Sequence, residues 1–181
     1  MSYVIVGDNL IAAITGGVFY TTPLARTMAG SDKLEVSPAS VLVAYIIEEL
    51  DKMTYPSEKS DWPLYTSHLP DGDNVETDCG VVYDTTGLMD GRLMTGLVPQ
   101  HPGIQLRIRS RVYETGFNKI EDIAASLDEV SNSSFVIAAG EFEIQNASRT
   151  SPVIPLGLEV GSTKRRFLFT VNFILTVKKL A

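Results

Sequence analysis

Three arginines stand at alternate positions in one short stretch of the chain, at Arg107, Arg109 and Arg111. Side chains of a β-strand alternate between its two faces, so in an extended chain these guanidinium groups form one column and the apolar residues between them face the core. Such a column can bind phosphate, or it can pair with carboxylates of a neighbouring strand or subunit. Because the chain is acidic, we favour ion pairing, with Glu141 and Glu143 on another expected strand as candidate partners.

Acid–base and metal chemistry have few candidate residues. His68 and His101 are the only histidines and Cys79 is the only cysteine, which excludes His-rich and Cys-rich metal sites. The glycines match neither phosphate-binding pattern, and no Gly-x-Ser-x-Gly nucleophile elbow occurs. We therefore expect no enzymatic activity and no cofactor, and we interpret Cys79 as a structural cysteine.

An acidic stretch, residues 71–78, carries carboxylates at alternate positions, as a calcium-binding loop does. It departs from the EF-hand pattern at two positions, because Val75 occupies the fifth and Glu76 replaces the glycine required at the sixth. We interpret this stretch as a solvated turn and expect no metal there.

Composition favours one folded core in a chain of 181 residues, of which 44% are hydrophobic and 20% charged. The formal net charge of -7 excludes a whole-surface affinity for nucleic acid or anionic membrane, so any contact with phosphate must be local. No stretch approaches the roughly 18 uninterrupted apolar residues of a spanning helix. We expect the protein to be cytosolic when made.

The elements that position these residues belong to a compact α+β domain, residues 37–181, with an antiparallel sheet flanked by two helices. A serine followed by proline at residues 37–38 is a helix start, and apolar residues recur at helical spacing as far as about residue 52. A second helix is expected over about 113–130, weakened in its first turn by Gly116. Strands are expected over residues 62–67, 80–84, 104–111, 134–145 and 166–178.

Two further segments lack a sustained pattern. Residues 84–102 are rich in glycine and proline, and a loop of this length in a compact domain is usually functional or mobile. Residues 1–36 hold short apolar segments separated by glycine turns, which predicts an N-terminal arm of short strands. Such an arm cannot build a core alone, so we expect it to bury against the domain, a neighbouring subunit or a neck protein, and we favour a neighbouring chain.

Several short motifs follow one another in a defined order. They are Val82-Tyr83-Asp84-Thr85-Thr86-Gly87, Gly91-Arg92-Leu93-Met94-Thr95-Gly96, Pro102-Gly103-Ile104-Gln105-Leu106-Arg107-Ile108-Arg109 and the late Arg165-Arg166-Phe167. Each motif is weak alone. In this order they resemble the tail-terminator proteins (tail-completion, minor capsid) of tailed bacteriophages, over roughly residues 37–179.

The resemblance implies a structural virion protein that forms a ring, commonly a hexamer, at the end of the tail tube and joins it to the neck. Implied partners are further copies of the chain, the tail tube protein, neck and connector proteins, and genomic DNA that passes through a central channel without specific binding. No membrane is implied, and assembly takes place in the host cytoplasm. Candidate interface residues are Arg107, Arg109, Arg111, Arg92 and Met94. The alternatives are another neck component, such as a head-completion or collar ring protein, and a small hydrolytic enzyme.

Overall fold

The computed structural model describes residues 3–6, 9–13, 19–23, 36–56, 62–70, 78–89, 100–159 and 165–180. The chain divides into two compact units, residues 1–31 and 32–181, and each unit is described by itself. The first unit holds three short strands, β1 (Tyr3–Val6), β2 (Asn9–Ala13) and β3 (Phe19–Pro23), which pair in sequence order as an antiparallel sheet. Whether residues 1–36 act as an arm stays a prediction.

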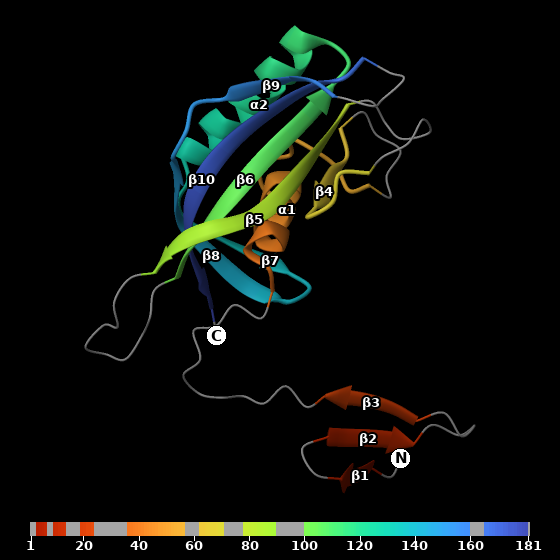
Figure 1. Ribbon diagram of the computed structural model, residues 1–181. Coiled ribbons are helices and arrows are strands. Elements are labelled where there is room, and N and C mark those ends of the chain that lie inside the picture. The colour runs from red at the N-terminus through yellow and green to blue at the C-terminus, as the bar shows by residue number, and fades with distance from the viewer. Residues whose placement is uncertain are drawn as a thin grey trace. The chain divides into compact units, whose positions relative to one another are not determined.

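The second unit is an α+β structure with a curled, mostly antiparallel sheet and two helices, which confirms the α+β class and the antiparallel sheet of the prediction (Figure 1). Its strand order is β4-β5-β6-β10-β8-β7, with β9 paired to β10 beside this path, and only β4 and β5 are parallel. The elements are α1 (Pro38–Glu48), β4 (Leu64–Thr66), β5 (Cys79–Met89), β6 (Gln100–Ser110), α2 (Tyr113–Asp128), β7 (Ser131–Ile137), β8 (Gly140–Arg149), β9 (Ile154–Leu158) and β10 (Phe167–Lys179).

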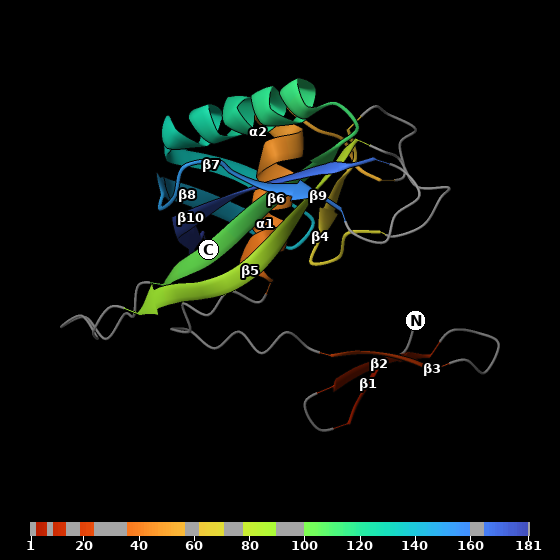
Figure 2. The same cartoon turned by 45° about the horizontal axis from the view of Figure 1, so that its top comes forward.

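Strand β10 is the centre of the sheet, as its apolar alternation indicates. It pairs with β6 along one side, and with β8 and β9 one after the other along the opposite side. Phe169, Val171 and Phe173 are buried on the face against which the helices pack, where α2 contacts β10, β6 and β8 (Figure 2). Because the side chains alternate, Arg107 and Arg109 lie on the opposite face.

The two helices begin at carboxylates supplied by the region of β5. Asp84 accepts hydrogen bonds from the Ser37 hydroxyl at 2.7 Å and from the Ala39 backbone N–H at 2.8 Å, so its charge lies at the N-terminus of α1. Asp78 accepts from the Ser110 hydroxyl at 2.7 Å and from the backbone N–H of the next residue at 2.9 Å, at the corner where β6 turns into α2. One strand therefore fixes the starting points of both helices.

Three expectations about the strands are wrong. Residues 134–145 form two strands, β7 and β8, because the chain reverses at residues 138–139 and Gly140 adopts a positive φ of 130°. Strand β9 was not predicted. Residues 84–102 are not all loop, since β5 continues to Met89 and β6 begins opposite it at Gln100; residues 90–99 lie outside the described residues.

A pair of glycines explains how β5 and β6 pair within that former loop. Gly87 lies beside the backbone of His101 and Gly103, and Gly103 lies beside the backbone of Thr86. A Cβ atom at either glycine would overlap these backbone atoms, so the two strands can come this close only without side chains. The register shift between Thr85 and Leu88 falls at the same place.

Candidate assembly surface

The arginine column does not form one exposed row of charge. Arg107 is half-buried, with its guanidinium group 5.3 Å from the centre of the Tyr83 ring and an N–H that donates to the Gln105 side-chain oxygen at 3.1 Å. Arg109 is completely buried, whereas Arg111 is exposed at the corner before α2. The three arginines therefore have three different environments.

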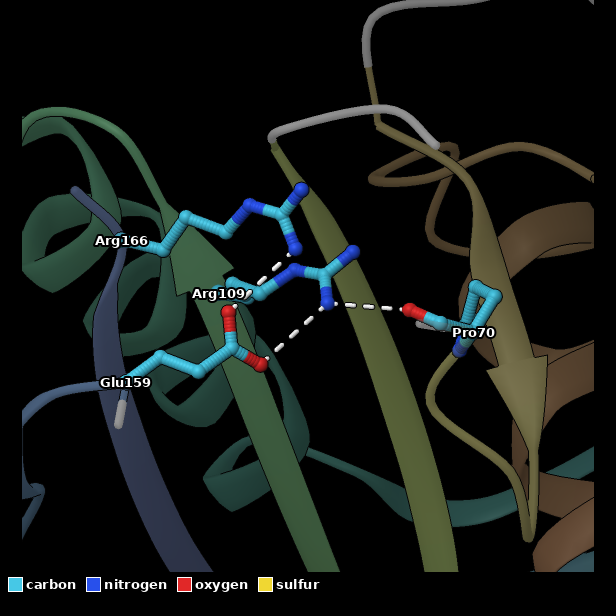
Figure 3. Close-up of polar contacts among 4 residues, drawn as sticks. All are labelled: Pro70, Arg109, Glu159 and Arg166. Atoms are coloured by element: carbon cyan, nitrogen blue, oxygen red, sulfur yellow. Dashed lines mark hydrogen bonds and ion pairs between the residues drawn. The ribbon is translucent and has the colours of Figure 1, made fainter. Parts of the chain in front are cut away.

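Arg109 and Arg166 share one carboxylate (Figure 3). A guanidinium nitrogen of Arg109 lies 3.5 Å from Glu159 Oε1 and donates to the Pro70 carbonyl at 3.0 Å, while Arg166 reaches Glu159 Oε2 at 3.3 Å. The two arginine side chains are 0% and 1% exposed, and the glutamate side chain is 16% exposed. Charge pairing compensates for the loss of water around these groups.

The cluster anchors β9 to the sheet. Glu159 directly follows β9, Arg166 directly precedes β10, and the Glu159 backbone N–H donates to the Arg166 carbonyl at 2.8 Å. Arg109 adds a tie from β6 to the same carboxylate. Backbone pairing and buried ion pairs thus hold the end of this edge strand together, and they fix the position of β9 relative to β10 and β6.

The expected partners of the arginines are corrected by the sheet order. Glu141 and Glu143 lie on β8, and β10 separates β8 from β6, so they are not cross-strand neighbours of the arginines. The ion pair of Arg109 runs instead to Glu159, which pattern reasoning did not find because it follows an unpredicted strand. The other candidate residues, Arg92 and Met94, lie outside the described residues.

The environment of Cys79 makes its thiol unreactive. The side chain is 0% exposed, and burial raises its pKa to about 11, although the nearby Arg109 guanidinium opposes this shift. The thiol therefore stays protonated near neutral pH, in agreement with a structural cysteine. His101 is held by its neighbour across the sheet, with its Nδ1 3.0 Å from the Thr176 hydroxyl.

Five of the seven exposed large apolar side chains among the described residues lie on β9 or at the start of α2. Ile154, Leu156 and Leu158 of β9 are 41–47% exposed, and Val112 and Tyr113 are 53% and 43% exposed. Leu158 lies close to the start of α2, because it pairs with Phe167, whose ring lies 5.5 Å from that of Tyr113. Beyond a register shift, Ile154 pairs with Thr170 and so lies on the other face of the sheet. We call Val112, Tyr113 and the three β9 residues the β9 surface.

Strand β9 also differs from the other sheet edges. In the described part of the chain it pairs only with β10, so its second edge is open. Edge strand β7 carries mainly serine and asparagine, and β4 has only three residues, both of which limit unwanted pairing. Strand β9 carries no charge, and its protection as an edge comes from Pro155 and the register shift against β10. Its exposed apolar side chains are typical of a protein–protein contact.

A signal for this strand exists in the sequence. Ile154, Leu156 and Leu158 alternate with Pro155 and Gly157, which is a strand pattern of period two. The proline and the glycine, which has a φ of 92°, argue against a strand in the sheet interior but are compatible with an edge. The pattern was therefore readable as an edge strand.

The described residues contain no group of three or more His, Cys, Asp or Glu residues arranged to hold a metal ion. Of the acidic stretch at residues 71–78, only Asp78 is described, and it anchors the start of α2. Neither described helix combines the length and the apolar character needed to cross a membrane. No protein-family model matches the chain, and no curated protein matches its sequence.

Proposed function

We propose that the chain is a tail-terminator protein of a tailed bacteriophage: a structural subunit that forms a ring at the end of the tail tube and joins the tube to the neck. The observation that carries this proposal is the β9 surface, an apolar open edge on an acidic protein. Exposed apolar side chains on an edge strand favour contact with a protein partner. The order of the sequence motifs, which resembles that of tail-terminator proteins, supports this class of assembly.

The proposal includes an arm, a channel and a set of partners. Residues 1–36 form an N-terminal arm that crosses to a neighbouring chain, and the helices flank the sheet of the ring domain. Each copy has a formal charge of -7, so six copies together carry 6 × -7 = -42. Such a charge lets DNA pass without binding. The partners are further copies, the tube protein and neck proteins, in the virion and without a membrane.

The end of the β5–β6 hairpin, with the residues that connect the two strands, is a further proposed contact. Residues 84–102, with Arg92 and Met94, meet the tail tube or an adjacent subunit, and Arg107 and Arg111 contribute to interfaces. Arg109 is different, because it is fully buried in its own domain. Reversing its charge is expected to disturb folding, so it is unsuitable as a test of assembly.

Mass measurement in solution tests the proposal. Size-exclusion chromatography with light scattering should give a ring, alone or after addition of purified tails that lack the protein, and electron microscopy of these tails should show it at the tube end. A ring that binds capsid connectors and not tails would favour another neck component. A chain that stays at 19.7 kDa under all these conditions would refute the ring. A small hydrolytic enzyme, the remaining alternative, has no need of such an assembly.

A further inference from the structure

The end of the β5–β6 hairpin extends past the central strand β10, and the His101–Thr176 contact at 3.0 Å links its base to that strand. The register of β10 against β6 ends at Gly103, so beyond this point β5 and β6 pair only with each other among the described residues. Figures 1 and 2 show the two strands projecting to one side of the unit. A two-stranded ribbon has little stability of its own in water, so a partner that packs on this end would stabilise it.

The hairpin end carries no Asp, Glu, Lys or Arg where the structure describes it, and it exposes one large apolar side chain, Leu88. The uncharged residues are 85–89 and 100–103, and Leu88 is 60% exposed. Strand β9 has the same character, since Ile154–Leu158 carries no charge. On a chain of net charge -7, copies that meet through these two segments do not have to bring carboxylates together or remove them from water.

The two surfaces lie at opposite ends of the sheet. Strand β6 runs from Gln100 in the hairpin to Ser110, which pairs with Phe167, and Phe167 pairs with Leu158 of β9. Eleven strand residues at about 3.3 Å each separate the two ends by roughly 35 Å. A contact between different surfaces at opposite ends of one chain is heterologous. Repeated contacts of this kind close into a ring where the rotation from copy to copy closes, and otherwise form an open filament.

We propose that the β5–β6 hairpin of one copy docks on the β9 surface of the next copy, with Leu88 beside Leu156. The proposal rests on the ring function and names the two surfaces that build the ring. The Arg109–Glu159–Arg166 cluster acts in this contact as a positioning device, because it fixes the end of the edge strand that receives the hairpin. Each copy then uses one hairpin and one β9 surface.

A mixing experiment tests the direction of the contact. Leu88→Glu breaks the hairpin surface and Leu156→Glu breaks the β9 surface, and each variant alone should be a monomer of 19.7 kDa. Mixed together, each variant supplies the surface that the other lacks, so the mixture should contain a dimer of twice this mass that grows no further. Val136→Glu is the matched control, since Val136 is 68% exposed on the polar edge strand β7 and its variant should assemble normally.

Cysteine cross-linking keeps the test decisive if a single contact is too weak to isolate. Because Cys79 is buried and its pKa is raised, single variants Leu88→Cys and Leu156→Cys present one reactive thiol each. A mixture of the two should form an intermolecular disulfide on oxidation, and a mixture of Leu88→Cys and Val136→Cys should not. If the wild-type chain forms rings but the mixture of Leu88→Cys and Leu156→Cys forms no disulfide, this contact is overturned and the ring function stands. A wild-type chain that never assembles would overturn the ring function itself.

Discussion

Gly116 in the first turn of α2 gives the sharpest test of how the helix is placed. A Cβ atom at this position would lie 2.6 Å from Phe169 Cε2 and 2.7 Å from Ser110 Cβ. Carbon atoms in favourable contact are about 3.5–4.0 Å apart, so the added methyl group is short of space by about 1 Å. Phe169 is completely buried, and its ring lies 5.1 Å from Tyr113 and 6.1 Å from Phe117, so it has little freedom to move away.

Two opposing effects set the stability of Gly116→Ala. Alanine favours a helix over glycine by about 1 kcal/mol. Inserting a methyl group into a packed core costs roughly 1–3 kcal/mol. Since the conflict involves a buried ring and a strand residue, we expect the packing cost to dominate and the free energy of unfolding to fall by about 1 kcal/mol. This differs from the sequence-based view of Gly116, in which glycine only weakens the helix.

Urea denaturation followed by circular dichroism measures this change, with the m-value as a check that the unfolded state is unaltered. Asn118→Ala, at an exposed position of the same helix, is the control and should be stabilised by its better helix propensity. In a Phe169→Leu background the ring atoms are absent, so the cost of Gly116→Ala should shrink or change sign. If Gly116→Ala raises stability as much as the control does, the close approach of α2 to β10 is refuted.

Three further predictions concern single groups. Asp84→Asn should lower the free energy of unfolding by about 1 kcal/mol in urea melts, because α1 loses a charged acceptor at its N-terminus; an effect no larger than that of the exposed control Glu141→Gln would contradict this role. Glu159→Gln should cost roughly 3 kcal/mol, because two buried guanidinium groups lose their shared carboxylate, and a loss below 0.5 kcal/mol would argue against the cluster. The pKa of Cys79 is about 11 in the folded protein and 9.0 ordinarily, so the thiol of the unfolded chain ionises first as pH rises. The free energy of unfolding is therefore unaffected by this thiol below pH 9. Between pH 9 and 11 it falls by up to about 1.4 kcal/mol per pH unit. Cys79→Ser should remove this slope, and an equal slope in both proteins would contradict burial of the thiol.

Helix and strand positions follow largely from local pattern in this protein. The helix start at Ser37, the stripe that buries Ile120 and Leu127, and the alternation that places Phe169 in the core depend on spacing along one element. Spacing of this kind is a property of neighbouring residues, so it can be read without knowing which elements meet. The same holds for the alternation of side chains along β6, which places Arg107 and Arg109 on the face opposite the core.

The partners of each element were decided only by the tertiary structure. Two residues on the same predicted face, Arg107 and Arg109, end half-exposed and fully buried, because only Arg109 meets Glu159. Sheet order placed β10 between β6 and β8, and no local pattern encodes the order of strands. By itself, the sequence determined the class of the fold and which side chains face inward. Which charges pair, why Gly116 and Gly87 must be glycine, and where an apolar edge stays open depend on contacts between distant segments, which exist only in the folded chain.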